Sequence, residues 1–199
     1  MRIRVPSPES RVPFPMPYSH LNDFPADVRE RAARVRLVAF DVDGTLTDGK
    51  LGLDGNGIES KQFHVQDGLG IKLLLDAGIE VALVTARKGT LVSRRADELG
   101  VRHVFLGVAD KLACIDALIA QLGLTLEQTA YMGDDLPDLV ALAAVGLSVA
   151  PASAHPWVRE RVHWRTQATG GNGAARELCD LILAASGKAD DVLRRYLRQ

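Results

Sequence analysis

The stretch RLVAFDVDGTLTDGK, residues 36–50, joins a short apolar run to two carboxylates. Residues 37–40 have the pattern of a strand covered on both faces. Asp41 and Asp43 follow this run, and Gly44 indicates that the chain turns there. Side chains two residues apart in an extended segment point to the same side, so both carboxylates could reach one site. Crowded carboxylates need a cation or a shared proton, although Asp and Gly can also form a simple turn at a strand end.

Apolar runs of strand length alternate with helical patterns along the rest of the chain. The predicted strands are residues 37–40, 81–84, 103–106, 130–132 and 146–150. The predicted helices are residues 25–36, 67–78, 90–100, 110–123 and 136–146. This alternation favours the α/β class, as a doubly wound, Rossmann-like parallel sheet with helices on both faces. Residues 50–65 depart from it, because two short runs around DGNG indicate a β-hairpin.

The length of the chain favours one folded domain with short extensions. A chain of 199 residues that is 47% hydrophobic can bury one sizeable core. We predict an extended or disordered arm over residues 1–24, a domain over residues 25–187 and a short amphipathic tail over residues 188–199. The arm lacks the apolar core of a signal peptide because it is broken by five prolines, namely Pro6, Pro8, Pro13, Pro15 and Pro17. No stretch approaches the roughly 20 apolar residues of a membrane span.

Charge and cysteine content exclude several classes of function. A formal net charge of -1 gives no support for non-specific binding to nucleic acid or to an acidic membrane. Any anionic ligand must therefore be met by a local site. Cys114 and Cys179 are isolated and lack CxxC spacing, which favours buried free thiols over a disulfide or a zinc site. This pattern fits a reducing cytoplasm.

Polar residues recur where the predicted strands end. Thr85 ends the second strand, Lys111 begins the helix after the third, and the fourth is followed by Asp134, Asp135 and Asp138. Ligands bind at the carboxyl ends of the strands in open α/β sheets, so these residues would share a rim with Asp41. Each also has a structural explanation, as a helix cap or a solvated lysine. Their common placement at strand ends favours a shared site.

The order DxDGT, Thr, Lys and GDDxxD resembles the haloacid dehalogenase superfamily of phosphotransferases, over about residues 36–186. The resemblance implies that Asp41 is a nucleophile that becomes an aspartyl phosphate, and that Asp43 is the general acid and then the general base. Thr85 would hydrogen-bond the transferring phosphoryl group, and Lys111 would neutralise its charge. Mg²⁺ would be held by the side chains of Asp41 and Asp134 and by the backbone carbonyl of Asp43. Asp135 and Asp138 would position Lys111 or a metal-bound water, or would simply cap a helix.

These residue types suit the implied chemistry. An anionic phosphate repels a carboxylate nucleophile, so a metal ion and a lysine are needed to neutralise its oxygens. Mg²⁺ prefers oxygen ligands and usually keeps several waters. Members of the superfamily that act on small phosphates usually carry a cap domain. Here the intervals from Asp41 to Thr85 and from Thr85 to Lys111 are already filled by predicted elements, which leaves no room for a cap.

The capless spacing and two further segments, FHVQDGLGIK (63–72) and GGNGAARELCDLIL (170–183), resemble a narrower group within the superfamily. That group acts on an eight-carbon sugar acid phosphate, an octulosonate, whose product enters the inner core of lipopolysaccharide. The resemblance implies a Mg²⁺-dependent homotetramer with a small-molecule substrate. The cysteine pattern and the charge add the expectation of a cytoplasmic protein with no nucleic acid or membrane partner. A phosphatase for nine-carbon sialic or deaminated sialic acid 9-phosphates is the near alternative. A regulatory or assembly subunit without turnover is the other.

The same resemblance implies a set of substrate contacts. A guanidinium can grip the carboxylate of a sugar acid in two places, which would suit Arg87 or Arg95. Arg95 could instead be a solvated helix residue, and His64 a polar residue at a strand end. The full predicted set is Asp43, His64, Val65, Gln66, Asp67, Gly68, Lys72, Arg87, Arg95 and Lys111. Without a cap, we expect the site to be closed by the hairpin of a neighbouring subunit, because an isolated hairpin with apolar residues needs a partner.

Overall fold

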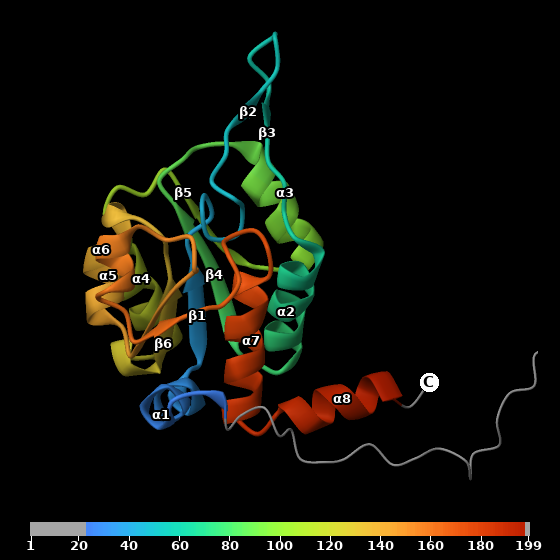
Figure 1. Cartoon of the computed structure of the whole chain (residues 1–199), viewed down its shortest axis with the longest axis vertical. Coiled ribbons are helices and arrows are strands. Elements are labelled where there is room, and N and C mark those ends of the chain that lie inside the picture. Colours follow the sequence, from blue (N-terminus) through green and yellow to red (C-terminus); the bar gives the residue numbers. More distant parts are fainter. Residues whose placement is uncertain (1–22, 198–199) are drawn as a thin grey trace, which may run out of the picture.

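The computed structural model describes residues 23–197. Six parallel strands form its central sheet in the order β5-β4-β1-β6-β7-β8 (Figure 1). They are β1 (Leu37–Phe40), β4 (Glu80–Thr85), β5 (His103–Leu106), β6 (Thr129–Met132), β7 (Leu147–Ala150) and β8 (Trp164–Arg165). The prediction of a doubly wound α/β sheet is confirmed. The predicted arm falls almost wholly outside the described residues.

Helices cover both faces of the sheet (Figure 1). On one face lie α1 (Ala26–Arg34), α2 (Val65–Asp76), α3 (Thr90–Leu99) and α7 (Ala174–Ala185). On the other lie α4 (Lys111–Leu122), α5 (Leu139–Ala144) and α6 (Pro156–Arg159). Strand β1 supplies both cores, because successive side chains of a strand point to opposite faces. Val38 and Phe40 enter the first core, whereas Leu37 and Ala39 enter the second.

A few elements differ from the prediction. The predicted helix 136–146 is divided into a 3₁₀ turn, η4 (Leu136–Asp138), and the helix α5. The turn η3 (Leu126–Gln128), the helix α6 and the strand β8 were not predicted, because each is too short to carry a recognisable period. The predicted tail contains the helix α8 (Ala189–Leu197), in which Val192 is buried. The division between a domain and a tail at residue 187 stays a prediction.

The hairpin β2 (Gly52–Leu53) and β3 (Glu59–Ser60) projects from the carboxyl end of the sheet (Figure 1). This confirms the predicted flap, and residues 23–197 contain no inserted cap domain. Leu51, Leu53 and Ile58 are all more than half exposed in the single chain. Their packing against other subunits stays a prediction. Within the described part of the chain, no helix has the length and apolar character needed to cross a membrane.

Candidate active site

The loop after β1 is shaped by close backbone contacts. Asp41 N extends the sheet by donating to Met132 O at 2.9 Å. The carbonyl of Val42 then accepts three backbone amides of the turn that follows. Gly44 adopts a φ of 90°, and a Cβ atom at this position would lie 2.1 Å from Asp134 Oδ2. Only glycine satisfies both the left-handed backbone and this close approach. The turn therefore brings the end of β1 against the end of β6.

A second segment supports this loop from the C-terminal part of the chain. Gly171 N donates to Thr45 O at 3.0 Å. A Cβ atom on Gly170 would lie 1.7 Å from Gly44 O, so these two backbones are in direct contact. The Gly-Gly pair of the late motif thus holds the loop that carries Asp41 and Asp43.

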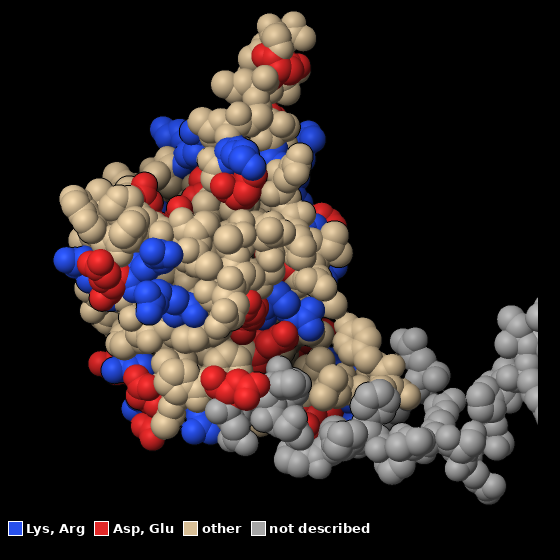
Figure 2. All heavy atoms as spheres, in the orientation of Figure 1, with Lys and Arg blue, Asp and Glu red and all other residues tan. Residues whose placement is uncertain are grey.

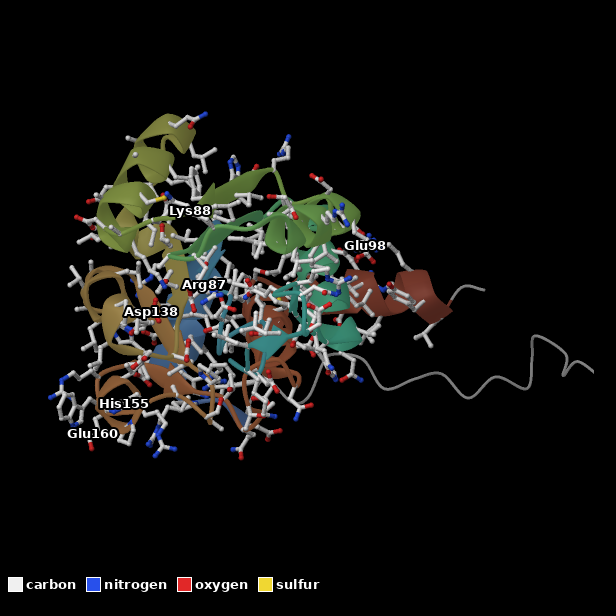
Figure 3. The ribbon with its side chains drawn as sticks, turned by 90° about the horizontal axis from the view of Figure 1, so that it is seen from above. Arg87, Lys88, Glu98, Asp138, His155 and Glu160 are labelled. Carbon is white, nitrogen blue, oxygen red and sulfur yellow. The ribbon has the colours of Figure 1, made fainter. Side chains whose placement is uncertain are left out.

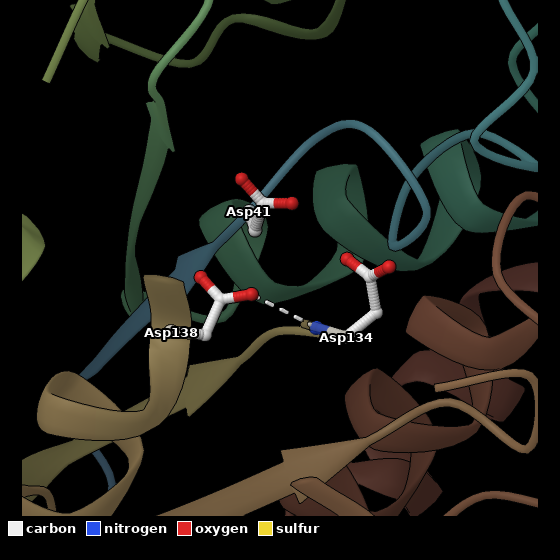
Figure 4. A group of neighbouring side chains, drawn as sticks. All are labelled: Asp41, Asp134 and Asp138. Atoms are coloured by element: carbon white, nitrogen blue, oxygen red, sulfur yellow. Dashed lines mark hydrogen bonds between the residues drawn. The ribbon is translucent and has the colours of Figure 1, made fainter. Parts of the chain in front are cut away.

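Three carboxylates converge behind this loop (Figure 4). Asp41, Asp134 and Asp138 each offer an oxygen, and these oxygens lie within 4.8 Å of one another. Lys111, the first residue of α4, donates to Asp41 Oδ1 at 2.7 Å and to Asp138 Oδ1 at 2.5 Å. One buried ammonium cannot balance three carboxylates, so the cluster favours either bound protons or a cation.

The pKa values reflect this excess of negative charge. Burial and then the Asp138 carboxylate raise the pKa of Asp41 to about 6, although Lys111 opposes the shift. Burial, followed by the charges of Asp41 and Asp138, raises the pKa of Asp134 to about 8. Burial alone would lower the pKa of Lys111, but its two carboxylate partners outweigh burial and raise it. Lys111 therefore remains a cation at neutral pH.

Asp138 and Asp135 have different surroundings. Asp138 is 1% exposed, and its Oδ1 accepts from Tyr131 Oη at 2.6 Å as well as from Lys111. Its Oδ2 accepts the backbone amides of Asp134 and Asp135, at 3.0 and 3.1 Å. Asp135 is exposed, and its side chain accepts from Leu136 N at 2.8 Å. Asp138 is thus placed to orient Lys111, whereas Asp135 caps the turn η4.

The donor set fits Mg²⁺ better through two of the carboxylates than through three. Both oxygens of Asp138 are already used by four donors, so Asp138 has little capacity left for a metal. The bond that Asp134 accepts from Thr45 Oγ1 is long, at 3.3 Å, and Asp41 accepts from Lys111. Asp41 and Asp134 are therefore the side chains suited to hold a divalent cation, and all-oxygen ligands match magnesium.

Asp43 faces the hairpin rather than the carboxylate cluster. Its Oδ1 forms an ion pair with Lys61 Nζ, and Arg87 Nε lies 4.0 Å from its Oδ2. Thr85 ends β4 beside β1, is 1% exposed, and accepts from Arg87 N at 3.2 Å. Seen from above, Arg87 lies near the middle of this end of the molecule, with Asp138 to one side (Figure 3).

Several predicted substrate residues lie apart from the cluster in the single chain. Asp67 is buried and caps α7, because it accepts the amides of Gly173 and Arg176 at 3.2 and 2.8 Å. Arg95 stacks over Phe63 and donates to Glu98 at 2.8 Å. The remaining members of this group lie on or beside α2, with Lys72, Val65 and Gln66 exposed and Gly68 and His64 next to Arg95 in a narrow pocket. Their role in binding stays a prediction.

Two residues at the site were missed from the sequence. Tyr131 lies in an apolar run and reads as core, yet burial and the Asp138 carboxylate hold its pKa well above the ordinary value. Its phenol therefore stays protonated and donates to Asp138. Lys61 follows the hairpin and resembles an ordinary charged residue in the sequence. Its only signal in the sequence is its position, directly after β3 and two residues before the segment FHVQDG.

Comparison with known proteins places this geometry in a family. A model of haloacid dehalogenase-like hydrolases matches residues 104–178. The 3-deoxy-D-manno-octulosonate 8-phosphate phosphatase KdsC of Yersinia pestis is 46% identical over 164 residues, which span 82% of this chain and 88% of that protein.

Solved structures agree with this relationship. The hypothetical protein XCC2798 from Xanthomonas campestris is 58% identical with a TM-score of 0.88, over 91% of this chain and 99% of that one. The 3-deoxy-D-manno-octulosonate 8-phosphate phosphatase from Moraxella catarrhalis, solved with a magnesium ion, a phosphate ion and KDO, is 40% identical with a TM-score of 0.84, over 85% of this chain and 98% of that one. This chain belongs to the haloacid dehalogenase-like hydrolases, in the family of the 3-deoxy-D-manno-octulosonate 8-phosphate phosphatases.

Proposed function

We propose that this enzyme hydrolyses 3-deoxy-D-manno-octulosonate 8-phosphate to the free sugar acid and phosphate. The observation that carries the proposal is the buried Asp41, paired with Lys111 and beside Asp134 at the end of β1, in a chain whose relatives carry that name. Phosphate transfer needs a nucleophile and fixed positive charge around the phosphoryl oxygens, and this arrangement supplies both.

The proposed reaction has two steps. An oxygen of Asp41 attacks phosphorus, and the bond to the sugar oxygen breaks as Asp43 gives that oxygen a proton. Asp43 then takes a proton from water, whose oxygen attacks the phosphorus of the aspartyl phosphate and releases Asp41. Lys111, held in place by Asp138, faces the phosphoryl charge, and Thr85 would donate to a phosphoryl oxygen.

A Mg²⁺ ion would be held by Asp41 and Asp134, with the backbone carbonyl of Asp43, and would supply charge neutralisation at the phosphoryl group. We further propose that the enzyme is a cytoplasmic homotetramer whose product enters lipopolysaccharide synthesis. Free cysteines at positions 114 and 179 suit a reducing compartment. The exposed apolar hairpin suits assembly with other copies.

The test is phosphate release from a panel of substrates with added Mg²⁺. We expect the octulosonate 8-phosphate to give a higher kcat/KM than nine-carbon sialic or deaminated sialic acid 9-phosphates. Preference for a nine-carbon substrate would reject the proposed substrate, while absence of turnover on every phosphate would favour the regulatory alternative. The residues that catalysis needs argue against that alternative, because all four are present, namely Asp41, Asp43, Lys111 and Asp134. Of these, Asp41, Lys111 and Asp134 meet in one cluster.

A further inference from the structure

The base of the hairpin carries a partly buried charge network that includes Asp43. Lys61 follows β3 directly, and its side chain is only 5% exposed although most of the hairpin is open to solvent. Lys61 Nζ forms an ion pair with Asp43 and lies 3.1 Å from Glu59 Oε1. Arg87 Nη2 lies 3.2 Å from Glu59 Oε2. Two acids and two cations therefore alternate across the loop after β1, the hairpin and the loop after β4.

The two oxygens of Asp43 have different environments. Oδ1 is held by Lys61. Oδ2 is buried and accepts no hydrogen bond from any residue of the described chain, and Arg87 Nε lies 4.0 Å from it. A buried acceptor without a partner is unfavourable unless a water or a ligand completes it. Oδ2 is thus the oxygen left to carry and transfer a proton.

The space next to this network suits a leaving group. A pocket of about 350 Å³ opens between the hairpin and the start of α3, and its lining includes Glu59, Lys61 and Arg87. Lys and Arg side chains flank the base of the projecting hairpin (Figure 2). The general acid must lie within hydrogen-bond reach of the oxygen that it protonates. Lys61 and Arg87 line this pocket and also lie next to the Asp43 carboxylate, so a sugar bound there would lie beside the two cations that flank Asp43.

We infer that Lys61 is a positioning residue for Asp43. Lys61 fixes Oδ1 of Asp43 so that Oδ2 faces the leaving oxygen, and the hairpin is thereby coupled to protonation of the leaving group. The inference rests on the proposed function, because it needs Asp43 to act as general acid. A hairpin that merely closed the site would not need a buried ammonium on that acid. Burial of a charge is unfavourable unless it is paired, so the ion pair also fixes the hairpin base on the loop.

The test compares two leaving groups in one protein sample. A sugar alkoxide needs a proton as it departs, whereas p-nitrophenolate is stable without one. Lys61→Met should lower kcat on the octulosonate phosphate by about 100-fold, the scale of general acid catalysis. On p-nitrophenyl phosphate the same variant should lose only a few-fold. Asp43→Asn serves as the reference and should show the same split. Lys61→Arg, which keeps a cation at this position, should restore most of the lost rate.

The matched control is Lys50→Met. Lys50 precedes the first strand of the hairpin, and its side chain is 86% exposed and pairs with Asp48 at 2.9 Å. It should leave both rates unchanged. Partial unfolding of Lys61→Met would lower both rates equally, so the ratio of the two losses reports positioning alone. If the Met variant does not fold, Lys61→Gln is measured in the same way.

An equal loss on both substrates, or no loss on either, would overturn the inference. Its failure is distinct from failure of the proposed function. If the wild-type enzyme prefers another sugar phosphate, the proposed substrate is wrong, yet the ratio can be measured on that alkyl phosphate and still decides the role of Lys61.

Discussion

Replacement of Asp138 by Asn tests whether this carboxylate anchors the site or only caps a helix. Asp138 accepts from four donors, namely Lys111, Tyr131 and the amides of Asp134 and Asp135. Asn offers one acceptor oxygen and one NH₂ group, so whichever way the amide is turned, two of the four donors meet another donor. Buried hydrogen bonds that involve a charged group contribute about 1.5–3 kcal/mol each.

Two lost bonds of this kind amount to about 3–6 kcal/mol. Relief of repulsion among the three carboxylates offsets part of that loss, so we expect the free energy of unfolding to fall by about 3 kcal/mol. For a chain of this size, that lowers Tm by roughly 6–12 °C. Neither Asp138 nor Lys111 is exposed enough for solvent to weaken the effect. Turnover should fall as well, because Lys111 loses one of its two anchors.

Urea unfolding monitored by circular dichroism measures the change, which should appear in the midpoint at an unchanged slope. Asp135→Asn is the matched control, because that exposed side chain caps η4 through Leu136 N and should cost no more than about 1 kcal/mol. If Asp138→Asn is as mild as its neighbour, the buried network does not hold Lys111 and the reasoning fails.

Four further predictions follow from the same geometry. Asp41→Asn should keep the fold and abolish phosphate release, since an amide cannot form the acyl phosphate; activity above a few per cent of wild type would reject the nucleophile. The pKa of Asp134 is raised, so between about pH 4 and 8 the folded metal-free protein holds a proton that the unfolded chain lacks. The free energy of unfolding of the metal-free protein should therefore fall as pH rises through this range. Mg²⁺ must displace that proton, so calorimetry should find a larger Mg²⁺-induced rise in Tm at pH 8.5 than at pH 6. Charged replacements at Leu51 and Leu53 should lower the assembled mass in sedimentation velocity and also turnover, whereas a fully active wild-type monomer near 21.5 kDa would contradict assembly through the hairpin. Gly170→Ala should push the Asp41 loop away from its place and reduce kcat more than KM; wild-type kinetics would show that the loop does not need this contact.

Much of the fold could be predicted because long elements carry a period. The strands at residues 37–40 and 103–106 match the structure residue for residue, and the long helices α3 and α4 differ by one residue or two. Elements of two to four residues, such as β8 and α6, carry too little pattern to be recognised. Their positions are fixed by tertiary contacts, since β8 pairs with β7 through Val149 and Ala150.

Part of the candidate site could likewise be predicted from the sequence, and part could not. Asp41, Lys111 and Asp134 were predicted to meet because each follows a strand end, and parallel strands bring their ends to one edge. Lys61 reaches Asp43 only because the hairpin folds back, which the sequence pattern does not specify. Residues on α2 and α3, such as Arg95, were assigned to the substrate by resemblance alone. In the single chain Arg95 is engaged with Phe63 and Glu98.

Asp138 shows why two readings of one residue need not compete. From the sequence alone, its carboxylate could either cap a helix or position Lys111. The structure assigns one task to each oxygen: Oδ2 accepts the amides of the turn, and Oδ1 accepts Lys111 and Tyr131. The amides fix the direction of the carboxylate, and the phenol fixes its distance from β6. The bonds that fix the turn η4 therefore also hold the carboxylate that anchors the lysine, since a carboxylate that was free to rotate would not keep the ammonium beside Asp41.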